Sequence, residues 1–438
     1  MTQALTEYDR YADQYANVAG SGPTWLHNLR QKGFDNFSRL GFPTARRGNE
    51  AWKYTNVAPV ARAEFSVSTS DESPSVEALR DSLPWVDDWN TLVFVNGRFS
   101  PELSIVHDTG SVTVSGLSAL VESDGTVARQ HLGSLASVED DGFAALNTAF
   151  IGDGAVVHVP DNVRVERPVH LAFVSTEEVS FVAHPRVLVV AGSESEATVV
   201  ESYMSLGENP YFTNAVTEVV VEEGARVEHY RLMDESDESY HVGVARVRQK
   251  DGSSFSSRAF YKGVGLGRHD LYALIGDGCE TDLSGLYITS GSQHMDNFIN
   301  LDHAQPNSTS RLYYKGILSG RSRAVFGGTV FVREGADKTD SLQSDKNLLL
   351  SPDAEVDSKP ALFIWADDVK CGHGATAGNV DEDTVFYMRS RGVDLETASR
   401  LLIFGFASEI IDTVALSELR EYLERSFLEA IPKYEFNF

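Results

Sequence analysis

Residues 216–225 read VTEVVVEEGA, and residues 242–253 read VGVARVRQKDGS. Each stretch is a short run rich in valine that ends at an acidic residue, a Gly and a small residue. β-Branched residues favour strands, and an acidic residue beside a Gly favours a turn. The two stretches therefore predict strands that are separated by tight turns.

The turn signature recurs along the chain at a nearly constant interval. Its copies Glu223-Gly224-Ala225, Asp251-Gly252-Ser253 and Asp277-Gly278-Cys279 lie 28 and 26 residues apart. Further copies, two of them without the Gly, are Asp153-Gly154-Ala155, Glu196-Ala197 and Asp353-Ala354. A period of about 27 residues predicts one three-stranded coil of a parallel β-helix, with the Gly at the bend and the small residue in the stack. A β-sandwich or a double-sheet jelly roll also has many short strands and is the main alternative.

Helix-like spacing marks the regions on either side of the strands. Residues 1–90 predict a mostly helical N-terminal region, residues 91–377 the β-helix core, and residues 378–438 a C-terminal helical region. In the last region Asp381 and Asp394 are candidate N-caps, and Ser417 opens an amphipathic stretch. These helices either cover an open end of the solenoid or form a docking module for a partner, and the two interpretations are compatible.

The charge balance argues against one class of partner. The chain has 438 residues, with 64 acidic against 37 basic side chains and a net charge of −27. A surface this acidic repels nucleic-acid phosphates, so we expect no nucleic-acid partner. It is typical of a halophilic-type protein in a salty cytoplasm, where salt screens the repulsion between carboxylates.

Three further features predict a cytoplasmic location. No run approaches about 18 consecutive apolar residues, which argues against a membrane span. The first residues, MTQALTE, lack the basic start and the apolar stretch of a secretion signal. Only Cys279 and Cys371 are present, which excludes a disulfide framework and fits a reducing compartment.

The familiar catalytic signatures are missing, so we do not expect an enzyme. The GxxxxGK[ST], GxGxxG and HExxH motifs do not occur in the sequence. The constellation that stands out instead is DDVKCGHGAT, at residues 367–376. If this stretch is extended, Asp367, Cys371 and His373 share one face.

A thiolate and an imidazole two residues apart suit a soft or borderline metal such as iron or zinc. Two ligands are too few for a closed site, so the others come from elsewhere in the fold or from another chain. A buried Cys371 and a hydrogen-bonded His373 without any metal are the alternative. Lys370 is expected to lower the pKa of the Cys371 thiol if it lies near the sulfur.

Two other polar features are weaker candidates. Cys279 occupies the small-residue position of the repeat, which Ala225 fills elsewhere, so packing is the favoured interpretation. His294, Asp296 and His303 lie in one polar segment, which predicts a surface ladder or an interface more strongly than a metal site.

Several stretches resemble the SufB/SufD family of iron–sulfur cluster assembly proteins. The resemblance covers roughly residues 150–430 and is carried by YKGIL (314–318), ADKTDSLQ (336–343), NLLLS (347–351), ADDVKCGHGAT (366–376) and FYMRSRG (386–392). The form Cys-x-His-Gly-Ala-Thr at 371–376 is similar to the SufD branch, whereas SufB typically carries His-Glu-Ala-Thr. NEAWKYT, at residues 49–55, also resembles a segment near SufD N-termini.

The resemblance implies a right-handed parallel β-helix flanked by helical regions, which agrees with the repeat. It also implies a non-catalytic scaffold in a complex with SufB and two copies of the ATPase SufC, which docks on the C-terminal helices. We expect this docking surface to include Phe386, Arg391, Leu402 and Phe406. Cys371 and His373 match the family's ligands at the SufB–SufD interface, where an iron–sulfur cluster is held transiently. No cofactor is expected on the isolated chain, and a homodimer without SufB, the cluster type and a flavin contribution are left open.

Three alternatives stay open at this stage. An adhesin-type β-helix without a metal role would need a secretion signal, and a polysaccharide-acting β-helix enzyme would need clustered Asp and basic residues on one face. SufB itself is disfavoured by the Cys-x-His form.

Overall fold

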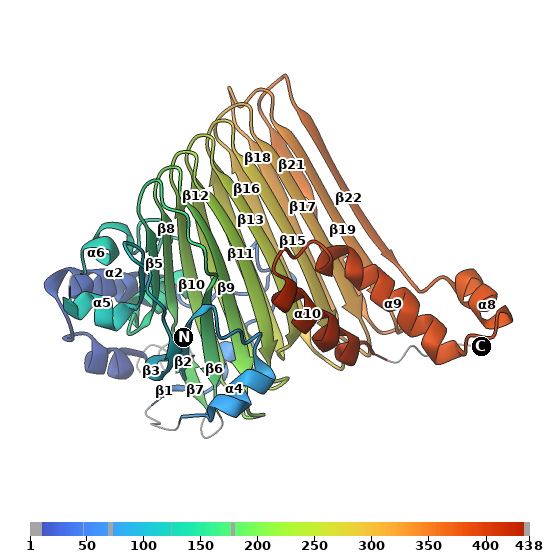
Figure 1. Cartoon of the computed structure of the whole chain (residues 1–438), viewed down its shortest axis with the longest axis horizontal. Helices are drawn as coiled ribbons and strands as arrows, with labels where there is room; N and C mark the ends of the chain where they lie inside the picture. The colour runs from blue at the N-terminus through green and yellow to red at the C-terminus, as the bar shows by residue number, and fades with distance from the viewer. Residues whose placement is uncertain (1–10, 47, 69–72, 124, 177–179, 433–438) are drawn as a thin grey trace.

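The chain forms a solenoid of two parallel sheets, with helices packed against its outer sides (Figure 1). The computed structural model describes residues 11–46, 48–68, 73–123, 125–176 and 180–432. Successive long strands alternate between the sheets, and each pairs in parallel with the strand two places later, through about eight turns. Parallel pairing throughout the core confirms the predicted β-helix and contradicts the β-sandwich, whose sheets are antiparallel.

We call the two sheets A and B. Along its length sheet A contains β4 (Thr113–Gly116), β5 (Gly154–Val159), β8 (Arg186–Ala191), β10 (Phe212–Val221), β12 (Tyr240–Gln249), β14 (Leu266–Ile275), β16 (His294–His303), β18 (Arg323–Val332), β20 (Glu355–Ser358) and β21 (Ala361–Ile364), with β1 (Ser66–Val67) and β7 (Phe181–Ala183) at its side. Sheet B contains β3 (Arg98–Ile105), β2 (Asn90–Val95), β6 (Val169–Ser175), β9 (Glu196–Ser205), β11 (Arg226–Glu235), β13 (Ser254–Gly263), β15 (Glu280–Thr289), β17 (Thr309–Leu318), β19 (Asp340–Leu349) and β22 (Lys370–Gly378). At the first end of the solenoid, β3 pairs in antiparallel fashion with β2 in sheet B, and β4 pairs in antiparallel fashion with β5 in sheet A.

Each coil contains two long strands, so the prediction of three was wrong. β10 and β11 have ten residues each, and paired positions of β10 and β12 lie 28 residues apart, as Phe212 and Tyr240 do. A ten-residue strand is about 33 Å long at about 3.3 Å per residue. Two such strands and two short turns account for the whole period, because the period fixes only the sum of strand and turn lengths.

The turns from sheet A to sheet B share one residue in the left-handed conformation. Its φ is +67° at Gly224 and Gly252 and +61° at Gly278. The N–H of Gly224 donates to the carbonyl of Asp251 in the next coil over 3.0 Å, and the N–H of Gly252 donates to Asp277 over 2.8 Å. The residues that follow, Ala225, Ser253 and Cys279, are buried. The central copies of the signature therefore confirm the predicted bend and the small residue in the stack.

The remaining copies of the signature lie at other places, and their assignment to the same turn was wrong. Gly154 begins β5, and Asp353-Ala354 lies between β19 and β20, where the chain passes from sheet B to sheet A. Glu196-Ala197 begins β9, two residues after Glu194, which holds the left-handed conformation in that coil. An acidic residue followed by a small one occurs both at turns from sheet A to sheet B and at turns from sheet B to sheet A, because both kinds of turn are exposed to solvent.

Helices from the N-terminal part cover the outer side of sheet A. They are α2 (Thr24–Leu40), α3 (Ala58–Arg62), α5 (Leu117–Ser123), α6 (Thr126–His131) and α7 (Gly142–Ala149). A further helix, α4 (Val76–Ser82), packs instead on the outer side of sheet B, where its Leu79 lies with Val93 and Val174 in one apolar cluster. Phe143 of α7 packs with Phe34 of α2 and with outward-facing Val216 and Val244 of sheet A in one apolar cluster. Because α5 to α7 lie between β4 and β5, helices and strands alternate well beyond residue 90. The division of the chain into three regions at residues 90 and 377 stays a prediction.

The three C-terminal helices pack on one another, and the last two lie on the outer face of sheet B, whereas the first lies beyond β22 (Figure 1). They are α8 (Glu382–Ser390), α9 (Leu395–Ile411) and α10 (Ser417–Ala430), and Asp381 and Asp394 are N-caps as predicted. Outward-facing Tyr230, Phe260 and Leu286 pack with Ile403 and Phe427 of these helices. The interpretation as an end cap was wrong, because sheet B needs its apolar outer face covered. No helix among the described residues combines the length and apolarity that crossing a bilayer requires.

The interior of the solenoid becomes polar toward its C-terminal end. Four of the five inward-facing side chains of β19 are polar and buried, and the fifth is the half-buried Leu349; we call the four the β19 polar row, Ser341, Gln343, Asp345 and Asn347. Asp345 accepts hydrogen bonds from Ser358 and, over 2.7 Å, from Asn347, and its other oxygen has no partner. Burial raises the pKa of Asp345 to about 6, although both hydrogen bonds oppose the shift.

A buried ion pair joins the N-terminal region to sheet A. Arg186 of β8 and Glu218 of β10 are fully buried and lie 2.6 Å apart. Glu218 also accepts hydrogen bonds from the backbone N–H groups of Gly133, Leu135 and Ala136 over 2.8, 2.8 and 3.0 Å. Burial by itself would raise the pKa of Glu218, but Arg186 and these donors outweigh it and hold the pKa below its usual value.

We expect Glu218→Gln to lower the apparent melting temperature strongly, because it leaves the buried Arg186 without a counter-charge. Removing one partner of a buried pair costs about 3–5 kcal/mol. The control is Glu196→Gln, which removes the exposed pair with Arg164 and costs about 1 kcal/mol or less. Equal melting temperatures for the two variants would contradict a stabilising role for this pair.

In the wild-type chain, Asp345 makes the free energy of unfolding decrease as pH rises from about 4 to about 6. We expect Asp345→Asn to remove this contribution, so that the free energy of unfolding changes less over the same range. The pKa of Asp345 is about 6 in the folded chain against an ordinary value of 3.8. The folded chain therefore binds this proton more tightly than the unfolded chain, so stability is present at low pH and falls as pH rises through the window. The difference amounts to about 3 kcal/mol. Denaturation from pH 4 to 7 measures it, with the half-exposed Asp340→Asn as control; parallel curves for wild type and Asp345→Asn would refute the assignment.

Candidate functional site

Cys371 and His373 lie on β22, the last strand of sheet B. β22 pairs with β19, with Cys371 opposite Ser341 and His373 opposite Gln343. Among the described residues no strand pairs with the other edge of β22. Cys371 is half-buried and contacts the interior apolar cluster, whereas His373 is exposed. The predicted common face of the two side chains follows from strand alternation and is the inward face of the solenoid.

Asp367 does not join this face. β22 begins at Lys370, and Asp367 is exposed in the bend that precedes it, where strand alternation does not apply. The neighbouring Asp368 pairs with Lys338 of the preceding coil. The prediction that Asp367 shares a face with Cys371 and His373 was wrong because the extended stretch is shorter than expected.

Burial raises the pKa of the Cys371 thiol above its usual value. The backbone N–H of Ser341 opposes this shift, and the charge of Asp340 adds to it. The expected lowering by Lys370 is not found, because adjacent side chains on a strand point to opposite faces. The thiol is therefore protonated at neutral pH and must release a proton when it binds a metal.

The two side chains form an incomplete metal site. A sulfur and an imidazole nitrogen suit iron or zinc. Across the described ranges, no three His, Cys, Asp or Glu side chains gather in a way that would hold a metal ion. Any closed four-ligand site at Cys371 and His373 therefore requires ligands from outside the described part of this chain.

Apolar side chains are exposed on the last coil around β22. Phe363 of β21 and Trp365 beyond it are 49% and 59% exposed. Phe363 stacks on Phe331 of β18 and on Trp365, with ring centroids 5.4 and 6.3 Å apart. Leu342 of β19 is also exposed. An unpaired strand edge beside exposed aromatic residues is typical of a protein–protein interface.

Cys279 has the packing role that the repeat predicts. It is buried in the stack of small residues, and its thiol donates to the carbonyl of Lys250 over 3.0 Å. Burial raises the pKa of this thiol, so it has no reactive character.

The polar segment at 294–303 is split between the two faces of β16. His294 and Asp296 point outward and contact Thr55, over 3.0 Å for His294 and 2.5 Å for Asp296. His303 points inward and forms a 2.9 Å hydrogen bond with Ser310. The three side chains do not meet, so the less favoured metal interpretation is contradicted by the alternation of the strand.

The segment at 49–55 holds the N-terminal region against sheet A. The Trp52 ring lies 3.8 Å from the guanidinium carbon of the buried Arg268, and the carbonyl of Ala51 accepts from Arg268 over 2.9 Å. Glu50 pairs with Lys359, between β20 and β21, over 2.9 Å. This segment therefore fastens the N-terminal region to the outer face of sheet A as far as the last coil.

The four expected docking residues divide into two pairs. Phe386 is 73% exposed and Arg391 is exposed, with its guanidinium 5.1 Å from the centroid of the exposed Tyr387 ring. Leu402 and Phe406 instead pack inward against the solenoid. The structure therefore brings Phe386 and Arg391 to the outer surface, whereas Leu402 and Phe406 lie on the half-buried side of α9.

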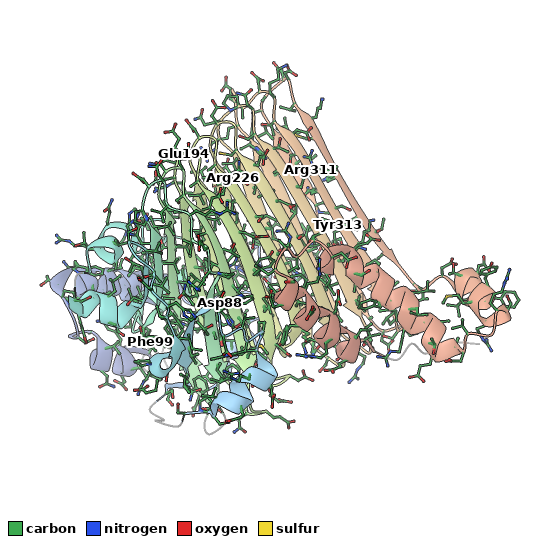
Figure 2. The ribbon with its side chains drawn as sticks, viewed as in Figure 1. Asp88, Phe99, Glu194, Arg226, Arg311 and Tyr313 are labelled. Carbon is green, nitrogen blue, oxygen red and sulfur yellow. The ribbon has the colours of Figure 1, made fainter. Side chains whose placement is uncertain are left out.

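Sequence reasoning missed the side chain that fastens α9. Lys315 of β17 is buried; it donates to the carbonyl of Phe406 over 2.8 Å and pairs with Glu409 over 2.6 Å. Tyr313, beside α9 in Figure 2, donates to Glu409 over 2.8 Å. The signal was present in the YKG stretch, because a Lys among apolar outward positions of a strand needs a specific partner.

Comparison with known proteins agrees with this geometry. Residues 173–406 match the family of the SUF system FeS cluster assembly, SufBD core domain, and residues 1–171 match the SufBD protein N-terminal region. The match to the N-terminal region extends the resemblance beyond residues 150–430.

Individual relatives cover nearly the whole chain. An iron–sulfur cluster assembly SufBD family protein of Synechocystis is 33% identical over 94% of this chain and 92% of its own. SufD of Escherichia coli is 31% identical over 90% of both chains, and SufD of Bacillus subtilis is 27% identical over 92% of this chain and 93% of its own. The chain therefore belongs to the SufBD family of iron–sulfur cluster assembly proteins.

Proposed function

We propose that this chain is a SufD-type, non-catalytic scaffold subunit that acts in the cytoplasm and pairs with SufB through its last coil. The observation that carries the proposal is a two-ligand set, Cys371 and His373, on a strand whose other edge pairs with no strand of the described residues. A second chain that pairs with β22 would bring its own side chains beside these two. SufB is the partner that the resemblance implies, and it would supply the missing ligands.

The chemistry of the two side chains suits the transient holding of a cluster. The Cys371 thiol has a raised pKa, so iron binding displaces its proton and forms an iron–thiolate bond. The exposed His373 offers an imidazole nitrogen, a ligand that exchanges more readily than a second thiolate. A site with one ligand of each kind on this chain releases its cargo more easily than a closed Cys₄ site would.

We further propose that SufC docks on the exposed surface of α8. Phe386 and Tyr387 are 73% and 58% exposed, which is unusual for large apolar side chains without a partner. Arg391 beside Tyr387 adds a cation next to the aromatic pair. The ion pair between Lys315 and Glu409 links α9 to sheet B. Because α9 follows α8, this ion pair connects the proposed docking surface with the solenoid.

The first test is cluster assembly by the complex of this chain with SufB and SufC, purified without oxygen. We expect Cys371→Ala and His373→Ala to keep the complex intact in size-exclusion chromatography but to lower its iron and sulfide content severalfold or more. Cys279→Ser is the matched control, because this thiol is buried in the stack, and it should keep the wild-type content. Wild-type iron and sulfide in both Ala variants would refute the ligand assignment.

The second test concerns SufC. We expect Phe386→Ala together with Tyr387→Ala to weaken SufC binding about tenfold or more, as truncation of aromatic interface anchors usually does. Leu428→Ala on α10 removes a partly exposed apolar side chain outside the proposed surface and should leave the Kd unchanged. Titration calorimetry with purified SufC measures both variants, and an unchanged Kd for the double variant would place SufC elsewhere.

A further inference from the structure

A cleft on the outer side of sheet A has no role in the proposed function. Its volume is about 640 Å³, within the range of about 300–1,000 Å³ that ligand sites usually have. Residues between 40 and 52 and between 135 and 142 form its walls, and outward side chains of β12, β14 and β16 form its floor. None of the candidate metal ligands and none of the exposed α8 residues lines it. The chemistry of its ligand therefore follows from the side chains that do.

Three aromatic rings, those of Trp52, Tyr272 and Phe298, line the cleft and are half-buried. Two of them already hold a cation of the chain itself. The guanidinium carbon of the buried Arg268 lies 3.8 Å from the centroid of the Trp52 ring and 4.6 Å from that of the Phe298 ring. Aromatic faces attract guanidinium and ammonium groups, and their apolar area favours a ligand that also has an apolar part.

The ion pairs at the floor of the cleft contain more negative than positive charge. Arg246 pairs with Asp141 over 3.2 Å and with Asp270 over 2.9 Å, so two carboxylates share one guanidinium. Arg268 pairs with the other oxygen of Asp270 over 3.0 Å and with Asp296. Burial raises the pKa of Asp141, and Arg246 does not cancel this shift because the charge of Asp270 acts against it. Three carboxylates and two guanidinium groups thus leave one negative charge without a counter-charge in this network.

Two polar side chains of the cleft have no partner among the described residues. Asp140 is exposed at its edge, and Asn300 of β16 is half-buried on its floor. A free carboxylate pairs best with a guanidinium, which can donate two parallel hydrogen bonds to it. A free amide has both a donor and an acceptor, so it can pair with a peptide group.

We propose that this cleft binds a short segment of a partner protein in which an arginine side chain adjoins an apolar one. The guanidinium pairs with Asp140 beside the aromatic rings, the apolar side chain covers Tyr272 and Phe298, and Asn300 pairs with the backbone of the segment. A small free cation such as a polyamine would supply the positive charge but leave the rings uncovered. The inference goes beyond the proposed function and does not rest on it, because neither Cys371 nor His373 takes part.

The first experiment titrates the full-length chain with the peptides acetyl-X-Arg-X-Gly-amide, in which X is Leu, Phe or Trp, in about 0.15 M salt. Isothermal calorimetry measures the Kd. We expect citrulline in place of Arg, which keeps the shape and removes the charge, to weaken binding about tenfold or more. Ala at both X positions should weaken binding severalfold, because the rings then lose their apolar cover.

The second experiment separates the cleft from the general acidity of the chain. Asp140→Asn removes the free carboxylate and should weaken binding of the Arg peptides about threefold or more. Glu139→Gln removes the same charge one residue earlier, from a side chain that does not line the cleft and pairs with Lys32 over 3.3 Å, and should leave the Kd unchanged. Asn300→Trp places a large ring on the floor and should abolish binding, and circular dichroism checks that each variant is folded.

Three results would overturn the inference. Failure of every Arg peptide to bind at about 1 mM would show that the cleft takes no such segment. Equal weakening by Asp140→Asn and Glu139→Gln would mean that the peptides are attracted by the net charge of −27 alone. Displacement of the peptides by spermidine at the same concentration, with no effect of Ala at the X positions, would make the cleft a site for small cations instead of a protein segment.

Discussion

One backbone constraint recurs in seven successive coils: a residue in the left-handed conformation at the turn from sheet A to sheet B. The residues there are Asn162, Glu194, Gly224, Gly252, Gly278, Asn307 and Lys338. Gly and Asn adopt this conformation readily, whereas Glu194 and Lys338 adopt it at a cost of about 1–2 kcal/mol. The turn N–H groups bond to the carbonyl of the next coil, so the cost is offset by a continuous stack. Because a slip of one residue would invert every inward and outward side chain, this stack sets the register of all the columns.

The aligned columns explain where the charges and the helices lie. Inside, the register brings Glu201 of β9 against Arg231 of β11, and although burial alone would raise the pKa of Glu201, Arg231 holds it far below its usual value. Outside, the same register produces apolar stripes that the N-terminal helices cover on sheet A and α9 and α10 cover on sheet B. The N-terminal and C-terminal helices therefore form outer layers that cover the solenoid, because a sheet with two apolar faces must be covered on both.

The repeat and its period were readable because three successive coils have Gly at the left-handed position of this turn, each followed by a small buried residue. The number of strands per coil was not readable, since strand and turn lengths enter the period only as a sum. Alternation correctly predicted that Cys371 and His373 share a face, but it failed for Asp367, because nothing in the local sequence shows that β22 begins at Lys370. Lys315 was missed for a different reason. Its significance comes from a partner 94 residues away, Glu409, and no local pattern reports such a contact.

The two ends of the solenoid are built differently, and the difference bears on function. At the first end the antiparallel strands β3 and β4 complete the sheets, and Phe99, labelled in Figure 2, packs beside the interior cluster and close to Gly116. At the last end β22 exposes Gly and Ala beside the two candidate ligands, above the polar row of β19. A free end is most stable with a covered edge and an apolar floor. The interior of this chain is apolar at its first end and polar at its last, which is the expected pattern when a second protein completes the last coil.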